Sequence, residues 1–146
     1  MPVDVRTEIV INQPCAVVAA FAMDPDNAPQ WYENIKTVEW RSDRPLRVGS
    51  RIAFVAHFLG RRIAYTYEVA ELSPTRLRMR TADGPFPMET TYELDSVDGS
   101  LCRMQLRNRG EPTGFGRIVG FFVAFAMNAA NRKDLARLKM LLERAL

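Results

Sequence analysis

A long C-terminal helix is the feature that most constrains the fold of this chain. Pro112 cannot lie inside a helix, Thr113 can cap one, and no proline follows. Residues 113–146 therefore predict a single helix, about 45–50 Å long at about 1.5 Å per residue. The uncharged run 118–131 is too short for a membrane-spanning helix, which needs about 20 apolar residues.

The apolar residues of this helix form two stripes on nearly opposite sides, because successive residues are about 100° apart. One stripe runs the length of the helix, flanked by Leu135 and Leu141, and consists of Gly120, Ala124, Met127, Leu138 and Leu142. The other covers only the first half and consists of Ile118, Phe121, Phe122, Phe125 and Ala129. The first half thus has apolar surface on both sides, and one side must face a ligand, a membrane or a partner.

Alternating apolar and polar residues predict seven strands before this helix. We expect them at 3–12, 37–42, 51–58, 62–72, 75–82, 87–97 and 101–108. Two short helices are predicted after the first strand, one at 16–23 and one that carries Trp31, Tyr32 and Ile35. Short turns between neighbouring strands favour an antiparallel sheet, and only the terminal helix is long enough to cover it. The predicted class is α+β, with one domain over residues 1–146.

Three segments carry a resemblance to a known family: Asp24-Pro25 with Gln30-Trp31, the stretch 65–69, and the stretch 131–139. Together with the order of elements, they resemble the polyketide cyclase/dehydrase-like, START and birch-pollen-allergen (SRPBCC) superfamily. The resemblance implies a helix-grip fold, a seven-stranded curved antiparallel sheet wrapped on a long C-terminal helix. It also implies a cavity between sheet and helix for a lipid, polyketide, quinone or isoprenoid-like molecule.

Aromatic, thioether and small side chains are the candidates for lining such a cavity. We expect these residues to bind the ligand: Trp31, Trp40, Phe54, Tyr65, Tyr67, Met79, Met88, Tyr92, Met104, Gly120, Ala124 and Met127. For any one of them, plain core packing is the more frequent role. Phe122 and Phe125 could also turn inward and fill the space themselves, since the pattern does not determine how the helix is rotated.

The sequence offers no clear catalytic residue. His57 is the only histidine, and the alternation of its strand places it opposite Phe54 and Phe58, facing outward. No carboxylate pair has inward parity, and hydrolase, metal-ligand and P-loop spacings are missing. We therefore predict no metal and no cofactor, and leave the catalytic residues unknown.

Binding of an apolar small molecule, with carriage as an extension, is the leading function. The first alternative is a cyclase or dehydratase-like enzyme, because orienting a reactive chain in a cavity can itself lower a barrier. The second is an interaction module in which Phe121, Phe122 and Phe125 contact a membrane transiently or form a homodimer. Loop cover of these rings is the plain alternative.

The charged residues predict a solvated face and no nucleic-acid partner. Six arginines lie on two strands, at Arg76, Arg78, Arg80, Arg103, Arg107 and Arg109. Aromatic residues occupy the opposite parity, whereas nucleic-acid binding would need them interleaved. Glu89 and Glu93 on the intervening strand favour cross-strand ion pairs instead.

Cys15 and Cys102 lie far apart in the sequence and lack metal-ligand spacing. We expect two buried free thiols in a reducing cytosol rather than a disulfide. The N-terminus shows no basic and apolar signal pattern, so the expected location is cytoplasmic.

Overall fold

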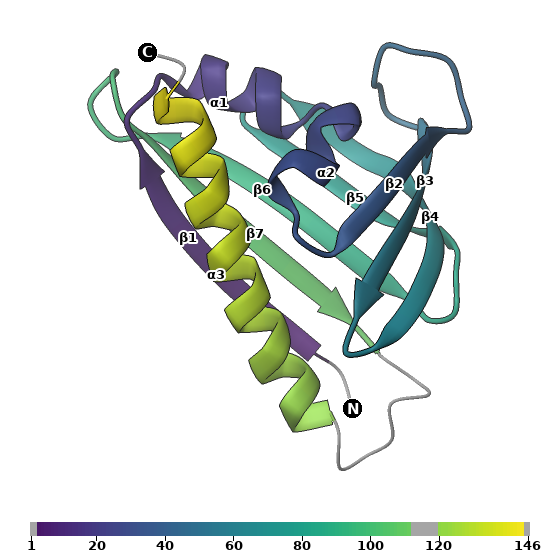
Figure 1. Cartoon of the computed structure of the whole chain (residues 1–146). Coiled ribbons are helices and arrows are strands. Elements are labelled where there is room, and N and C mark those ends of the chain that lie inside the picture. The colour runs from purple at the N-terminus through teal and green to yellow at the C-terminus, as the bar shows by residue number, and fades with distance from the viewer. Residues whose placement is uncertain (1–2, 112–119, 145–146) are drawn as a thin grey trace.

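Seven strands and one long helix dominate the structure, a computed structural model that describes residues 3–111 and 120–144, with only the backbone at 120–122. In chain order (Figure 1) the elements are β1 (Val3–Ile11), α1 (Cys15–Ala22), the 3-10 turn η1 (Pro25–Asn27), α2 (Ala28–Trp31), β2 (Ile35–Trp40), β3 (Arg51–Phe58), β4 (Arg61–Ser73), β5 (Arg76–Asp83), β6 (Met88–Ser96), β7 (Cys102–Gly110) and α3 (Gly120–Arg144). Every predicted strand is present, with ends at most two residues away. The predicted helix start at Thr113 lies outside the described residues.

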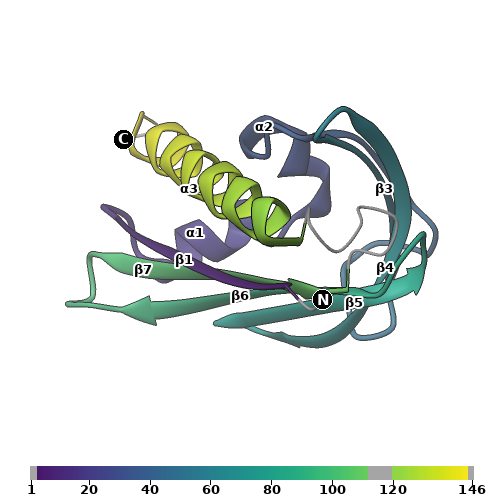
Figure 2. The same ribbon diagram turned by 90° about the horizontal axis from the view of Figure 1, so that it is seen from below.

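The strands form one antiparallel sheet in the order β1-β7-β6-β5-β4-β3-β2. Pairing shifts register between Ile35 and Thr37 in β2, and between Val69 and Glu71 in β4. Such bulges bend strands and increase their twist. Figure 2 shows the sheet curving at its β2–β4 end, with α1, α2 and α3 on the concave side. The helix-grip fold expected from the sequence is confirmed.

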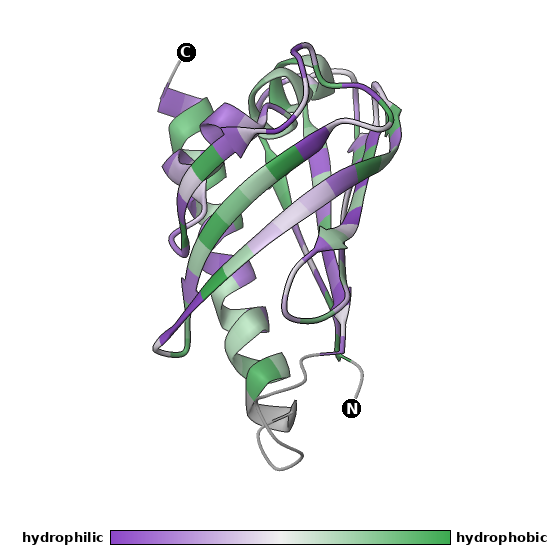
Figure 3. Cartoon of the chain, turned by 90° about the vertical axis from the view of Figure 1, so that its right-hand side faces the viewer, coloured by the Kyte–Doolittle hydropathy of each residue, from purple (hydrophilic) through white to green (hydrophobic). Residues whose placement is uncertain are grey.

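Alternating burial decides which side chains reach the concave side. In β3, Ile52, Phe54 and Ala56 are buried, whereas Arg51 and His57 are exposed. Apolar and polar bands alternate in the same way along several strands (Figure 3). The predicted outward orientation of His57 is therefore correct.

Helix α3 is anchored most firmly through its second half. Leu135, Leu138 and Leu142 are buried in the main core, while Val123 packs with Val3 and Val5 of β1. The ring of Phe125 is 71% exposed, so the alternative in which it fills the space beneath the helix is wrong. Only the backbone is described at Gly120, Phe121 and Phe122, and Ile118 lies outside the described residues.

The expectation of two free thiols is wrong, because Cys15 and Cys102 form a disulfide. Cys15 begins α1 and Cys102 begins β7. Helix α1 crosses the inner side of the sheet directly after β1, the neighbour of β7, and this brings the two Cα atoms to 4.9 Å. That separation lies within the usual range for a disulfide.

Ion pairs cover much of the basic outer face of the sheet, as the sequence predicted. Arg76 pairs with Glu93, and Arg78 with Glu89 at 3.7 Å. On the same face, near the β1 edge of the sheet, Arg107 on β7 forms a bidentate contact with Asp4 on β1, and their nearest N–O distance is 2.7 Å. Exposed pairs of this kind each contribute about 0–1 kcal/mol, so they organise the surface more than they stabilise the fold. No helix in the described part of the chain is long and apolar enough to cross a membrane.

Candidate ligand-binding cavity

A cavity of about 140 Å³ lies between the concave side of the sheet and helices α2 and α3. The strands contribute mainly apolar and aromatic side chains, among them Phe54, Ile63 and Leu77. Helix α3 contributes Val123, Met127 and Ala130 from above, followed by the polar residues Asn131 and Asp134. The cavity is comparable in size to an engineered apolar cavity of about 150 Å³ that holds benzene.

Three rings from adjacent strands form an aromatic wall of this cavity. The centroid of Tyr65 lies 5.5 Å from that of Phe54 and 4.9 Å from that of Tyr67. Phe54 and Tyr67 meet edge-on at 6.0 Å. Register explains the cluster, because Phe54 on β3 pairs directly with Tyr65 on β4 and Tyr67 follows on the same side. Packed rings of this kind are rigid apolar surface for a ligand.

A chain of hydrogen bonds leads from this wall to β7. The hydroxyls of Tyr67 and Thr90 are 2.8 Å apart, and Thr90 donates to Asn108 Oδ1 at 2.7 Å. Since Thr90 has a single hydroxyl proton, Tyr67 is the donor in the first bond. Burial raises the pKa of Tyr67 to about 12, so its hydroxyl stays neutral at physiological pH.

A second polar cluster lies where α2 meets α3. The hydroxyls of Tyr32 and Tyr92 hydrogen-bond to each other at 2.6 Å, and burial raises the pKa of both. Asp134 is close enough for its charge to raise these pKa values further. Its own Oδ1 accepts a hydrogen bond from the backbone N–H of Glu33 at 3.0 Å.

Asp134 is a buried carboxyl with 2% of its surface exposed. Burial raises its pKa to about 6, and the hydrogen bond from Glu33 opposes this only in part. At neutral pH the group is mostly ionised, yet it is more basic than an ordinary aspartate. Shifted carboxyls in cavities are frequent at functional sites, which makes Asp134 a candidate functional residue.

The structure brings seven of the predicted ligand-binding residues to this cavity: Phe54, Tyr65, Tyr67, Met79, Met88, Tyr92 and Met127. Trp31 and Met104 are fully buried in the core and do not line it. Ala124 packs toward Val3 and Val5 instead. Gly120 is described only by its helical backbone, so its place relative to the cavity lies outside the described residues. Ligand contact by the seven residues remains a prediction.

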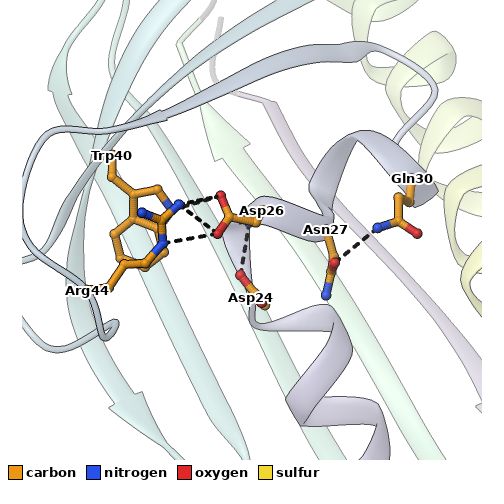
Figure 4. Close-up of polar contacts among 6 residues, drawn as sticks. All are labelled: Asp24, Asp26, Asn27, Gln30, Trp40 and Arg44. Atoms are coloured by element: carbon orange, nitrogen blue, oxygen red, sulfur yellow. Dashed lines mark hydrogen bonds and ion pairs between the residues drawn. The ribbon is translucent and has the colours of Figure 1, made fainter.

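Trp40 does not line the cavity, but its contacts support a neighbouring segment that does (Figure 4). Its Nε1 donates to Asp26 Oδ1 at 2.9 Å, and the Arg44 guanidinium lies over its ring at 4.8 Å. Arg44 also pairs with both oxygens of Asp26. These contacts tie η1 to the segment after β2. They thereby hold in place Pro25, which lines the cavity.

The polar residues on α3 were missed by the sequence analysis. Asn131 lies at the centre of the apolar stripe formed by Met127, Leu138 and Leu142, and Asp134 lies at its edge. Polar residues within a buried stripe are a signal that could have identified this site. Tyr32 was placed in a short helix but not recognised as a cavity residue. Its role depends on how α2 lies against α3, which the sequence pattern does not give.

A curved sheet that grips a long helix around an apolar cavity defines a helix-grip protein. The model of the family described as "Polyketide cyclase / dehydrase and lipid transport" matches residues 2–143, and the chain belongs to this family. The resemblance seen in the sequence is thereby confirmed. No protein with curated annotation matches the sequence.

Several solved structures share the fold. A protein from Thermus thermophilus superposes with a TM-score of 0.83 at 21% identity, over 97% of this chain and 98% of that one. A START superfamily protein from Mycobacterium smegmatis reaches 0.82 at 12% identity, over 98% and 99% of the two chains. The Zhui aromatase/cyclase from Streptomyces sp. R1128 reaches 0.78 at 14% identity, over 99% and 95%. At these identities the likeness shows the fold alone.

Proposed function

We propose that this protein binds a hydrophobic small molecule in the cavity beneath α3, as a carrier or store. The single observation that supports this most is a largely apolar cavity in which an aromatic wall faces a helix. Empty apolar space forfeits dispersion contacts, and a ligand would restore them. The family description, which includes lipid transport, is consistent with the proposal.

Native mass spectrometry of freshly purified protein tests this proposal, with Ala130→Phe as the discriminating variant. Ala130 on α3 lines the cavity, so a phenyl ring there should fill it and abolish ligand uptake. The neighbouring residue Ala129 is exposed and does not line the cavity. We expect a co-purified apolar mass adduct in the wild type and in Ala129→Phe, and none in Ala130→Phe.

Two results would count against a binding function. One is a wild-type protein that carries no adduct and takes up no added apolar compound. The other is equal uptake by Ala129→Phe and Ala130→Phe, which would place any binding elsewhere. Circular dichroism of both variants would establish that the helix and sheet content are retained.

A specific observation also favours a second candidate, an enzyme of the cyclase or dehydratase type. Asp134 has a raised pKa, and it lies in the cavity wall next to the neutral hydroxyls of Tyr32 and Tyr92. Such a carboxylate can act as a general base toward a C–H group beside a ketone, and neutral donors can stabilise the resulting enolate oxygen.

Proton exchange tests this chemistry without knowledge of the natural substrate. If Asp134 is a base, the protein should accelerate exchange of the α-protons of 4-phenyl-2-butanone with D₂O, followed by NMR. General-base catalysis contributes about 10²–10⁴-fold, and Asp134→Asn should remove this acceleration. Exchange at the buffer rate in the wild type would instead leave binding as the only function supported by the cavity.

The exposed ring of Phe125 supports the interaction surface predicted from the sequence. Membrane contact and a homodimer both remain proposals, because Phe121 and Phe122, which would complete the patch, lie outside the residues whose side chains are described.

A further inference from the structure

Asn131 on α3 has a buried donor without a hydrogen-bond partner. Asn131 is 4% exposed, and its Nδ2 has no hydrogen-bond partner among the described residues. About nine in ten buried polar groups in proteins are hydrogen-bonded, and an unpaired one is destabilising. Asn131 lines the cavity, so an occupant of the cavity is in a position to supply the missing acceptor.

A second donor is available in the same part of the cavity. Tyr32 and Tyr92 have one hydroxyl proton each, and their mutual hydrogen bond uses only one of the two. No partner for the other proton is found among the described residues. Where α2 meets α3, the cavity therefore ends in two hydrogen-bond donors that have no partner among the described residues.

Asp134 limits which kinds of ligand oxygen could accept hydrogen bonds from these donors. It lies one helical turn after Asn131 on the same side of α3, and both residues line the cavity. A negative charge on the ligand would lie close to this carboxylate and be repelled, whereas a neutral carbonyl or hydroxyl would not. A ligand hydroxyl could also donate to the carboxylate.

Trp31 shows why position in the cavity matters. Its Nε1 is likewise buried and unpaired among the described residues, but Trp31 does not line the cavity. It packs against the rings of Tyr32 and Tyr92, at centroid distances of 4.1 Å and 5.6 Å. Its unpaired donor is a local feature of the core, whereas that of Asn131 belongs to a residue of the cavity wall.

We propose that the ligand is a neutral molecule with an apolar body and a carbonyl or hydroxyl oxygen at one end, and that this oxygen accepts a hydrogen bond from Asn131 Nδ2. This rests on the proposed binding function and specifies its ligand class. The apolar body lies against Phe54, Tyr65 and Tyr67, and the oxygen lies where α2 meets α3. Fatty acids and other carboxylates are excluded as preferred ligands.

Three probes of one shape test the inference by isothermal titration calorimetry near pH 7.5. These are 4-propylphenol, 4-propyltoluene and 4-propylbenzoate, which differ only in the group at one end. In the wild type we expect 4-propylphenol to bind about fivefold to tenfold more tightly than 4-propyltoluene, the range that one net hydrogen bond supplies. The benzoate should bind more weakly than the phenol.

The variant Asn131→Leu should remove the preference for the phenol while it still binds 4-propyltoluene. Its thermal midpoint should equal or exceed that of the wild type, because a buried unpaired donor has been removed. Asn128→Leu is the matched control, since Asn128 lies one turn earlier on α3 and does not line the cavity. This control should keep the wild-type preference.

Each result other than the expected one would overturn a particular part of the proposal. Equal binding of phenol and toluene by the wild type would overturn the inference but leave the binding function standing. A preference that survives Asn131→Leu would overturn the assignment to Asn131, and tightest binding of the benzoate would overturn the neutral class. If none of the probes binds, the proposed function fails, and this inference fails with it.

Discussion

Reduction of the Cys15–Cys102 disulfide is expected to lower the free energy of unfolding by about 4–5 kcal/mol. The two residues are 87 positions apart, so the bond closes a long loop in the unfolded chain. The chain-entropy model gives about 4.5 kcal/mol for a loop of this size. The free energy of unfolding of a typical domain is about 5–15 kcal/mol, so this bond would supply a large share of it.

Guanidinium unfolding with and without dithiothreitol measures this effect. Cys102 is fully buried, so samples must equilibrate long enough for the reductant to reach the sulfurs through the unfolded state. The double variant Cys15→Ala/Cys102→Ala is the control, and its midpoint should not respond to the reductant. A wild-type midpoint that is equally insensitive would contradict the prediction.

The cytoplasmic location stays a prediction. It no longer has the support of free thiols, because the two cysteines form a disulfide.

Replacement of Asp134 by Asn is expected to stabilise the protein by about 3 kcal/mol near pH 7.5 and to have little effect near pH 4. Burial raises the pKa of this carboxyl from 3.8 to about 6, and about 1.4 kcal/mol corresponds to each unit. The folded state therefore holds the proton more tightly than the unfolded state. The contribution of Asp134 to the stability of the wild type should therefore fall as pH rises from about 4 to about 6 and then level off.

Urea unfolding at several pH values, read as the difference between wild type and variant, isolates this one group. Glu33 and Arg137 also act on Asp134, with opposite signs, and both are kept in the variant. The exposed residue Asp43 supplies the control Asp43→Asn, which should show no such pH-dependent gain. If Asp134→Asn is less stable at every pH, the hydrogen bond from Glu33 outweighs the burial of the charge.

A gain in stability on loss of Asp134 would itself bear on function. Groups that destabilise the unliganded fold are retained mainly where activity needs them. Asp134 and Asn131 are both of this kind, because one is a buried charge and the other a buried unpaired donor. Their common place in the cavity wall makes a ligand the simplest reason for their presence.

Strand positions and side-chain faces could be read from the sequence because both depend on local periodicity. The strand 51–58 was predicted with its observed ends, and the same alternation placed Phe54 inward and His57 outward. The paired arginines of the outer face follow from the same rule. Aromatic residues with inward parity were good candidates for the cavity wall, since inward parity and a curved sheet together bring them to one concave side.

Tertiary structure alone decided which inward residues meet empty space and which meet other atoms. Met104 and Trp31 have the same chemical character as Met79 and Tyr92, yet they are packed in the core while the latter line the cavity. The pairing of Cys15 with Cys102 and the meeting of Asp134 with Glu33 likewise join segments about 90–100 residues apart. Periodicity is a property of neighbours along the chain, whereas cavities, disulfides and raised pKa values arise from how whole elements are placed against one another.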